Sequence, residues 1–144
     1  MKKEIIDMLV RTGELRIRQR DIERIKSMIK SAETNANVVK KMSLNDDSAT
    51  VIFREIYESI RQLGDAKWWL AGYEPLNHDV SMKSLEELEV KEKIRLNFLR
   101  RFKKIRNDAN YRGFRVPVSQ AKEIIDLWDS CGRDIIRLLI KELQ

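Results

Sequence analysis

The stretch VIFREIYESIRQLGDAKWWLAG, Val51 to Gly72, indicates the class of fold. Apolar residues recur along it at every third or fourth position: Ile52, Ile56, Ile60, Leu63, Ala66 or Lys67, and Leu70. This spacing places them in one stripe along an α-helix. Three residues that cap helix N-termini precede the stretch, Asp46, Asp47 and Ser48, and Gly72 is a stop signal. The sequence therefore predicts a long helix that ends near Ala71.

The segments on both sides of this helix have the same helical period. The segment from 20 to 43 carries a stripe made of Ile22, Ile25, Ile29, Ala32, Ala36, Val39 and Met42. Near the C-terminus, Ser119 stands where it would cap a last helix. Its inner stripe would contain Ile124, Leu127 or Trp128, Cys131, Ile135, and Leu138 or Leu139. A long helix is expected in each segment.

A third long helix is expected from about Val90 to Gly113. Its inner residues would be Ile94, Phe98, Phe102, Ile105 and Ala109. In a continuous helix, Arg95 and Arg106 would lie at nearly the same angle around the axis, because they are eleven residues apart. The stretch GYEPLNHDVS before it predicts a turn and a short helix to about Glu87, with Asn77 or Asp79 as its cap.

No stretch alternates apolar and polar residues as a half-buried strand would. The predicted fold is all-α, an antiparallel up-and-down bundle of four long helices plus a short helix. Residues 1–144 would form one domain, with residues 1–19 as an N-terminal extension that the pattern does not place. Trp68 and Trp69 are adjacent and cannot both face one core, so at least one is expected at an interface or a helix edge.

The composition restricts the classes of chemistry. A single Cys131 excludes an internal disulfide, and a single His78 excludes the paired histidines of a carboxylate-bridged di-metal bundle. His78 lies in the predicted turn, where a capping role and a role in a site are both open. Nothing resembles a signal peptide, a membrane span or a Gly-rich phosphate loop. We expect a cytoplasmic protein with no membrane partner and no cofactor.

Positive charge gathers in one part of the chain. The net charge is +6, and residues 89–115 hold ten Lys or Arg against three Asp or Glu, a net of +7. This predicts an anionic partner such as RNA or a nucleotide. The candidate nucleic-acid-binding residues are Arg95, Arg100, Arg101, Lys103, Lys104, Asn110, Arg112 and Arg115. Charge complementarity within the molecule or between subunits is the alternative explanation.

The same segment contains a polar cluster at a predicted helix end, in KKIRNDANYRGFRV, Lys103 to Val116. The guanidinium of Arg106 is a permanently charged fork that fits a phosphate. Asn107 adds a donor and an acceptor, and the Tyr111 hydroxyl can donate to the same anion. These three are the candidate catalytic residues. In the alternative, this is an ordinary helix terminus in which Arg106 pairs with an acidic side chain of a neighbouring helix.

The motif RNDANYRG, Arg106 to Gly113, resembles the signature of the HEPN superfamily in its position after a basic amphipathic helix. The upstream stretch FREIYESIRQLGDAKWWLAGYEPLNHDVSMKSL, Phe53 to Leu85, is similar to the second helix of these domains and the His-containing turn and short helix that follow it. The resemblance extends from about Arg20 to Leu143.

This resemblance implies an all-α homodimer in which two copies of the motif face each other across a cleft. Many members are metal-independent endoribonucleases of toxin–antitoxin, defence or RNA-processing systems, often paired with a minimal nucleotidyltransferase. Others bind nucleotides or RNA without cleaving. Arg106 and Asn107 match the family's Arg and the polar residue after it, whereas Tyr111 stands where active members carry histidine.

The resemblance leads to two expected functions. The first is a HEPN-like endoribonuclease, or an RNA-binding relative without activity, because a tyrosine with a pKa near 10 is a poor general base at neutral pH. The second is a non-catalytic, nucleotide-binding or interaction subunit that partners a minimal nucleotidyltransferase.

Overall fold

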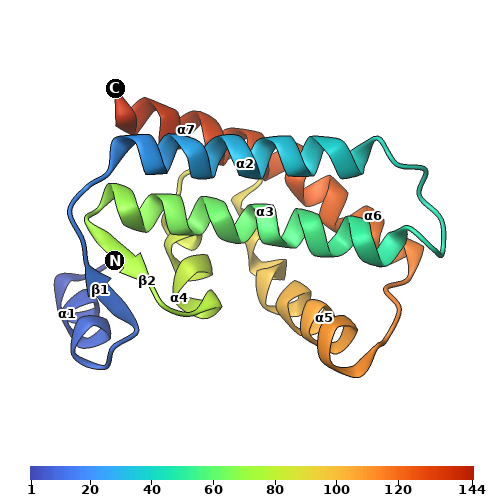
Figure 1. Cartoon of the computed structure of the whole chain (residues 1–144), viewed down its shortest axis with the longest axis horizontal. Coiled ribbons are helices and arrows are strands. Elements are labelled where there is room, and N and C mark those ends of the chain that lie inside the picture. The colour runs from blue at the N-terminus through green and yellow to red at the C-terminus, as the bar shows by residue number, and fades with distance from the viewer.

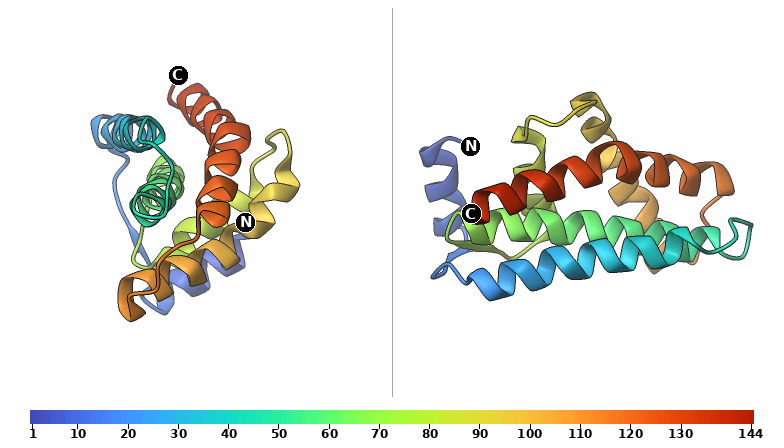
Figure 2. Two further views of the ribbon diagram at one scale, coloured as in Figure 1. Left: turned by 90° about the vertical axis from the view of Figure 1, so that its right-hand side faces the viewer. Right: turned by 90° about the horizontal axis from the view of Figure 1, so that it is seen from above.

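Helix α3 (Ala49–Leu70) lies at the centre of the computed structural model, which describes all 144 residues (Figure 1). Helix α2 (Ile22–Lys40) runs antiparallel beside it, and α5 (Leu99–Arg112) and the pair α6 (Val118–Leu127) and α7 (Arg133–Leu143) lie on its other sides (Figure 2). The chain thus runs along α2, back along α3, out along α5 and back along α6 and α7. The predicted all-α bundle is confirmed.

Smaller elements complete the chain. They are α1 (Lys3–Arg11), β1 (Leu15–Ile17), β2 (Tyr73–Pro75), α4 (His78–Lys83), 3-10 turns over Ser84–Glu87 and Lys93–Phe98, and a π turn over Trp128–Gly132. The π turn joins α6 to α7. The predicted short helix is α4 with its following 3-10 turn, and Asn77 caps it by accepting a hydrogen bond of 2.9 Å from the backbone N–H of Val80.

The predicted apolar stripes form one continuous core around α3. In α2 the buried members are Ile25, Ile29, Ala32, Ala36 and Val39, whereas Ile22 and Met42 at the two ends are exposed. In α3 they are Ile52, Ile56, Ile60, Leu63 and Ala66. In the last helical segment both Leu127 and Trp128 are buried, together with Ile124, Cys131, Ile135 and Leu139. Helical periodicity therefore identified most of the core.

The start of the third long helix differs from the expectation. Helix α5 begins at Leu99 rather than near Val90, because Glu92 has a left-handed backbone with φ of 56° and residues 93–98 form a 3-10 turn. The buried residues are Leu96, Leu99 and Phe102, whose spacing of three fits a 3-10 helix leading into α5. The predicted inner residues Ile94 and Phe98 are 75% and 46% exposed. Arg95 therefore lies outside α5 and does not share a continuous helix with Arg106.

The N-terminal segment forms structure that the sequence did not reveal. Strand β1 pairs antiparallel with β2, Leu15 opposite Pro75. Each strand has three residues, which are too few for an alternation of apolar and polar residues to be recognised. Leu9 and Leu15 cover Trp68, whose Nε1 donates a hydrogen bond of 2.7 Å to the carbonyl oxygen of Val80. Trp69 lies in the main core, so the adjacent tryptophans face two different clusters, as expected, but both are buried and neither is exposed at a helix edge.

The start of α6 differs from the prediction. Pro117, not Ser119, occupies the N-cap position of α6, and its fixed backbone dihedral suits a position at a helix start. No helix combines the length and the apolar character needed to cross a bilayer.

Candidate functional site

Arg106 lies in α5 with its guanidinium half-buried against α3. Its Nη1 donates a hydrogen bond of 3.1 Å to Oδ1 of Asn107, and its guanidinium carbon lies 5.8 Å from the centre of the Tyr57 ring. Arg106 forms no ion pair with any carboxylate. The structure therefore excludes the alternative arrangement, in which Arg106 pairs with an acidic side chain of a neighbouring helix. Asn107 orients the guanidinium without neutralising it.

Tyr57 of α3 lies under Arg106. Its side chain is completely buried, and its hydroxyl has no hydrogen-bond partner. Burial raises the pKa of the Tyr57 phenol to about 12, and the positive charge of Arg106 only partly opposes this shift. The phenol therefore stays protonated at neutral pH and retains an unused donor, which is unusual for a buried hydroxyl.

His78, the first residue of α4, is half-buried near the same groups. Burial lowers its pKa, and the positive charges of Arg61, Arg106 and Lys103 lower it further, while Glu58 acts in the opposite direction. The imidazole is therefore neutral at pH 7, with one nitrogen free to accept a proton. The fold thus brings the single histidine of the chain into the electrostatic field of Arg106, although 28 positions separate them in the sequence.

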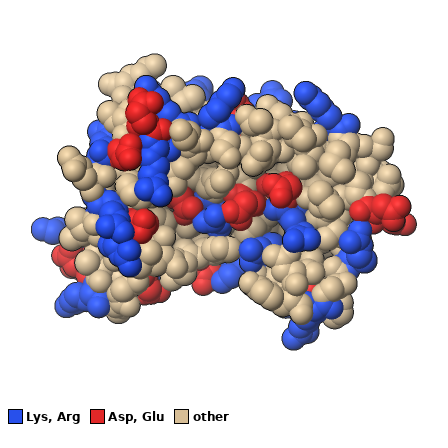
Figure 3. All heavy atoms as spheres, in the orientation of Figure 1, with Lys and Arg blue, Asp and Glu red and all other residues tan.

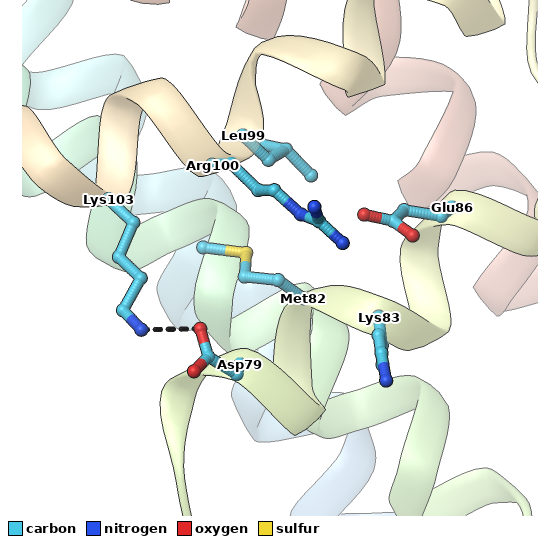
Figure 4. A pocket seen from close by; sticks show the side chains of 7 residues that line it. All are labelled: Asp79, Met82, Lys83, Glu86, Leu99, Arg100 and Lys103. Atoms are coloured by element: carbon cyan, nitrogen blue, oxygen red, sulfur yellow. Dashed lines mark hydrogen bonds and ion pairs between the residues drawn. The ribbon is translucent and has the colours of Figure 1, made fainter. Parts of the chain in front are cut away.

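An ion pair and a hydrogen bond link the three helices that contribute these residues. Nζ of Lys103 in α5 lies 2.5 Å from Oδ1 of Asp79 in α4 (Figure 4). Asp79 directly follows His78 in the sequence. On α3, Arg61 pairs with Glu58 and, at 2.7 Å, with Asp65. Burial raises the pKa of Asp65, which also accepts a hydrogen bond from the Ser81 hydroxyl at 2.5 Å. Arg61 is therefore neutralised and fixed, whereas Arg106 keeps its charge.

A small open pocket adjoins the Asp79–Lys103 pair. It has a volume of about 70 Å³ and is lined also by Met82, Lys83, Glu86, Leu99 and Arg100. Figure 4 shows Arg100 and Glu86 pointing toward one another across its mouth, with Met82 between them and Lys103. Arg100, a predicted nucleic-acid-binding residue, thus lies on the same side of the interface between α4 and α5 as Lys103.

Tyr111 does not join this cluster. Its side chain is 77% exposed and its hydroxyl forms no hydrogen bond in the structure. Five residues correspond to a rotation of about 140° around a helix, so Tyr111 and Arg106 leave α5 in different directions. Of the three predicted catalytic residues, the structure brings together Arg106 and Asn107 only.

The predicted binding residues are partly neutralised. Arg95 pairs with Glu92 at 3.5 Å, Arg101 pairs with Glu123, and Lys103 pairs with Asp79. Arg115 donates a hydrogen bond of 2.8 Å to the carbonyl oxygen of Asp47. Arg100, Lys104 and Arg112 are exposed and have no carboxylate partner, and Asn110 is exposed beside them. Figure 3 shows Lys and Arg among acidic side chains over the visible face rather than gathered over α5 alone.

Sequence reasoning missed Tyr57 and Arg61 as parts of the site. They are four residues apart and share one face of α3, but Tyr57 lies among the apolar residues of a core helix, and nothing in the sequence distinguishes it from them.

No three His, Cys, Asp or Glu side chains lie together in a way that would hold a metal ion. Comparisons of this chain with protein-family models, curated proteins and solved structures find no match.

Proposed function

We propose that this protein acts on RNA as a HEPN-like, metal-independent endoribonuclease, or as an RNA-binding relative of one, with Arg106 on the phosphate. The observation that carries the proposal is the half-buried guanidinium of Arg106, which has no carboxylate partner and lies over the buried Tyr57 ring. Removing such a charge from water is costly unless an anion compensates it. A phosphate would provide that anion.

Each residue of the site has a distinct role in this proposal. Arg106 would bind two phosphate oxygens, and Asn107 would keep its guanidinium in the required orientation. Tyr57 would form the buried floor beneath the guanidinium, and its raised pKa of about 12 keeps the phenol uncharged there. The exposed basic residues Arg100, Lys104 and Arg112 would contact the backbone on either side.

Fluorescence anisotropy with a labelled, mixed-sequence single-stranded RNA tests this role. Affinity is expected to fall steeply with salt, because bound phosphates release counterions. Arg106→Ala should weaken binding by about 10- to 100-fold, the value of a charge-assisted hydrogen bond. Arg133→Ala is a matched control, because Arg133 is an exposed arginine of α7 with no ion pair. Equal affinity of wild type and Arg106→Ala for this RNA would contradict the proposal.

A homodimer belongs to the same proposal. Tyr111 and Phe114, at the end of α5, are 77% and 56% exposed, and large exposed aromatic side chains are enriched in protein interfaces. Light scattering of the purified chain should give twice the mass of 17.1 kDa. The combined change Tyr111→Ser and Phe114→Ser should shift the mass toward the monomer, and a monomeric wild type would contradict this arrangement.

The second candidate is a non-catalytic, nucleotide-binding or interaction subunit for a minimal nucleotidyltransferase. The same exposed residues Tyr111 and Phe114 favour it, because they offer a surface to another protein as well as to a second copy. Calorimetry with ATP and with the RNA separates the two functions. Arg106-dependent binding of ATP without binding of RNA would favour this second candidate.

A further inference from the structure

Given the ribonuclease activity proposed above, on which this step rests, we infer that His78 is the general base that removes the proton from the attacking 2′-hydroxyl. It would be a catalytic residue supplied by α4, in place of a histidine within the RNDANYRG motif of α5. The two helices are far apart in sequence but meet on α3.

The geometry places His78 at the point where α4 and α5 come together. It immediately precedes Asp79, whose carboxylate pairs with Lys103 at 2.5 Å, and Lys103 is one helical turn before Arg106. The Asn77 cap holds the first turn of α4, because its Oδ1 accepts from Val80. Arg106 in turn lies over Tyr57. This role of His78 places the ribose next to a phosphate bound by Arg106 on the His78 side of α5.

The reaction needs one base and balances without a metal or an added reactant. An unprotonated ring nitrogen of His78 takes the proton of the 2′-hydroxyl while the 2′-oxygen forms a bond to phosphorus. The bond between phosphorus and the 5′-oxygen breaks, and that oxygen takes a proton from water. The hydroxide formed removes the proton from the imidazolium and restores the base. The products carry a 2′,3′-cyclic phosphate and a 5′-hydroxyl.

The surrounding charges prepare His78 for this role. The groups facing it are Arg61 and Glu58 from α3 and Arg106 and Lys103 from α5, with Asp79 beside it on α4. Burial and the three cations lower its pKa below the usual 6.5, so the imidazole is already neutral at pH 7. As the base must be unprotonated, the cleavage rate is expected to rise with pH, with a midpoint below pH 6.5, and then to level off.

The test measures cleavage of the labelled single-stranded RNA by the full chain in EDTA, with analysis of the product ends. The wild type should produce 2′,3′-cyclic phosphate ends. His78→Gln should lower the rate by about 10²- to 10⁴-fold, the usual contribution of a general base, without changing RNA affinity. His78→Ala should regain rate when free imidazole is added, which a purely structural role of His78 would not produce. Arg133→Ala, at an exposed arginine of α7 outside the site, should cleave as the wild type does.

The outcomes separate this inference from the function on which it rests. Arg106-dependent cleavage that persists at the wild-type rate and pH profile in His78→Gln would overturn the role of His78 alone. Arg106-dependent binding without any cleavage would also overturn it and leave an RNA-binding protein. Absence of both binding and cleavage would overturn the proposed function itself. Because the chain contains one histidine, NMR titration of its ring signals checks the lowered pKa directly.

Discussion

The hydroxyl of Tyr57 carries a cost to stability. Its buried hydroxyl lacks a partner, and a buried donor left without one is destabilising. Tyr57→Phe should therefore raise the free energy of unfolding by about 1 kcal/mol, measured by urea denaturation. The same change should leave RNA binding unchanged, because the buried hydroxyl is out of reach of a bound phosphate. A loss of stability in Tyr57→Phe would mean that the hydroxyl is already satisfied in solution.

His78 should also make stability depend on pH. Its pKa is lowered in the folded protein, so below pH 6.5 the unfolded chain takes up a proton more readily than the native one. The free energy of unfolding therefore falls as the pH is lowered from 6.5 to the folded-state pKa. The raised pKa of Asp65 acts in the opposite direction at lower pH, so the comparison must be made with His78→Gln. Thermal unfolding from pH 7 to pH 5 should show the His78 contribution in the wild type only.

At the level of elements, the position of α4 depends on a glycine of α3. A methyl group on Gly64 would overlap the carbonyl oxygen of Ser81, and the carbonyl oxygen of Gly64 accepts a hydrogen bond of 3.2 Å from the Ser84 hydroxyl. Close approach of the two backbones thus requires glycine. It also brings His78 and Asp79 of α4 near Tyr57.

Gly64→Ala should therefore destabilise the protein by roughly 1–3 kcal/mol, as overpacking does, although alanine is the better helix former. It should also lower the cleavage rate, because α4, which carries His78, moves away from α3. Chemical denaturation and the cleavage assay measure the two effects. Ala66→Gly, on the same helix, is a control that loses stability through helix propensity and cavity formation without pushing α4 outward. Wild-type stability in Gly64→Ala would contradict the close approach.

The elements also show where local pattern fails. The stripes of α2, α3 and α6 followed the helical period and were predicted correctly, because burial of one helix face is a local property of the sequence. The beginning of α5 was not, since Glu92 adopts a left-handed backbone without being glycine. Nothing in the residues from Val90 to Phe98 signals that break, and it decides that Arg95 lies apart from Arg106.

For the whole molecule, the N-terminal residues form a second, small apolar cluster separate from the main core. Leu9 of α1, Leu15 of β1 and Val80 of α4 enclose Trp68 there. Leu9→Ala should lower the free energy of unfolding by about 2–3 kcal/mol, toward the low end for buried leucine because this edge of the molecule can relax. The emission of Trp68 should shift to longer wavelength.

Ile5→Ala is the matched control, because Ile5 lies on the same helix and is 37% exposed. It should change stability by less than about 1 kcal/mol and leave the tryptophan emission unaltered. Equal effects of the two substitutions would mean that α1 does not dock through Leu9.

The amino-acid sequence by itself determined the all-α class, the order of the long helices and most core residues, because helical period is a local property. The choice of Arg106 and Asn107 as site residues stays a prediction. Only the tertiary structure decided that Arg106 lacks an acidic partner and that Tyr57 and His78 surround it while Tyr111 points elsewhere. The physical reason is that this cluster depends on how closely α4 and α5 pack on α3. That packing is set by contacts such as Gly64 against Ser81 and Lys103 with Asp79, between residues 17 and 24 positions apart.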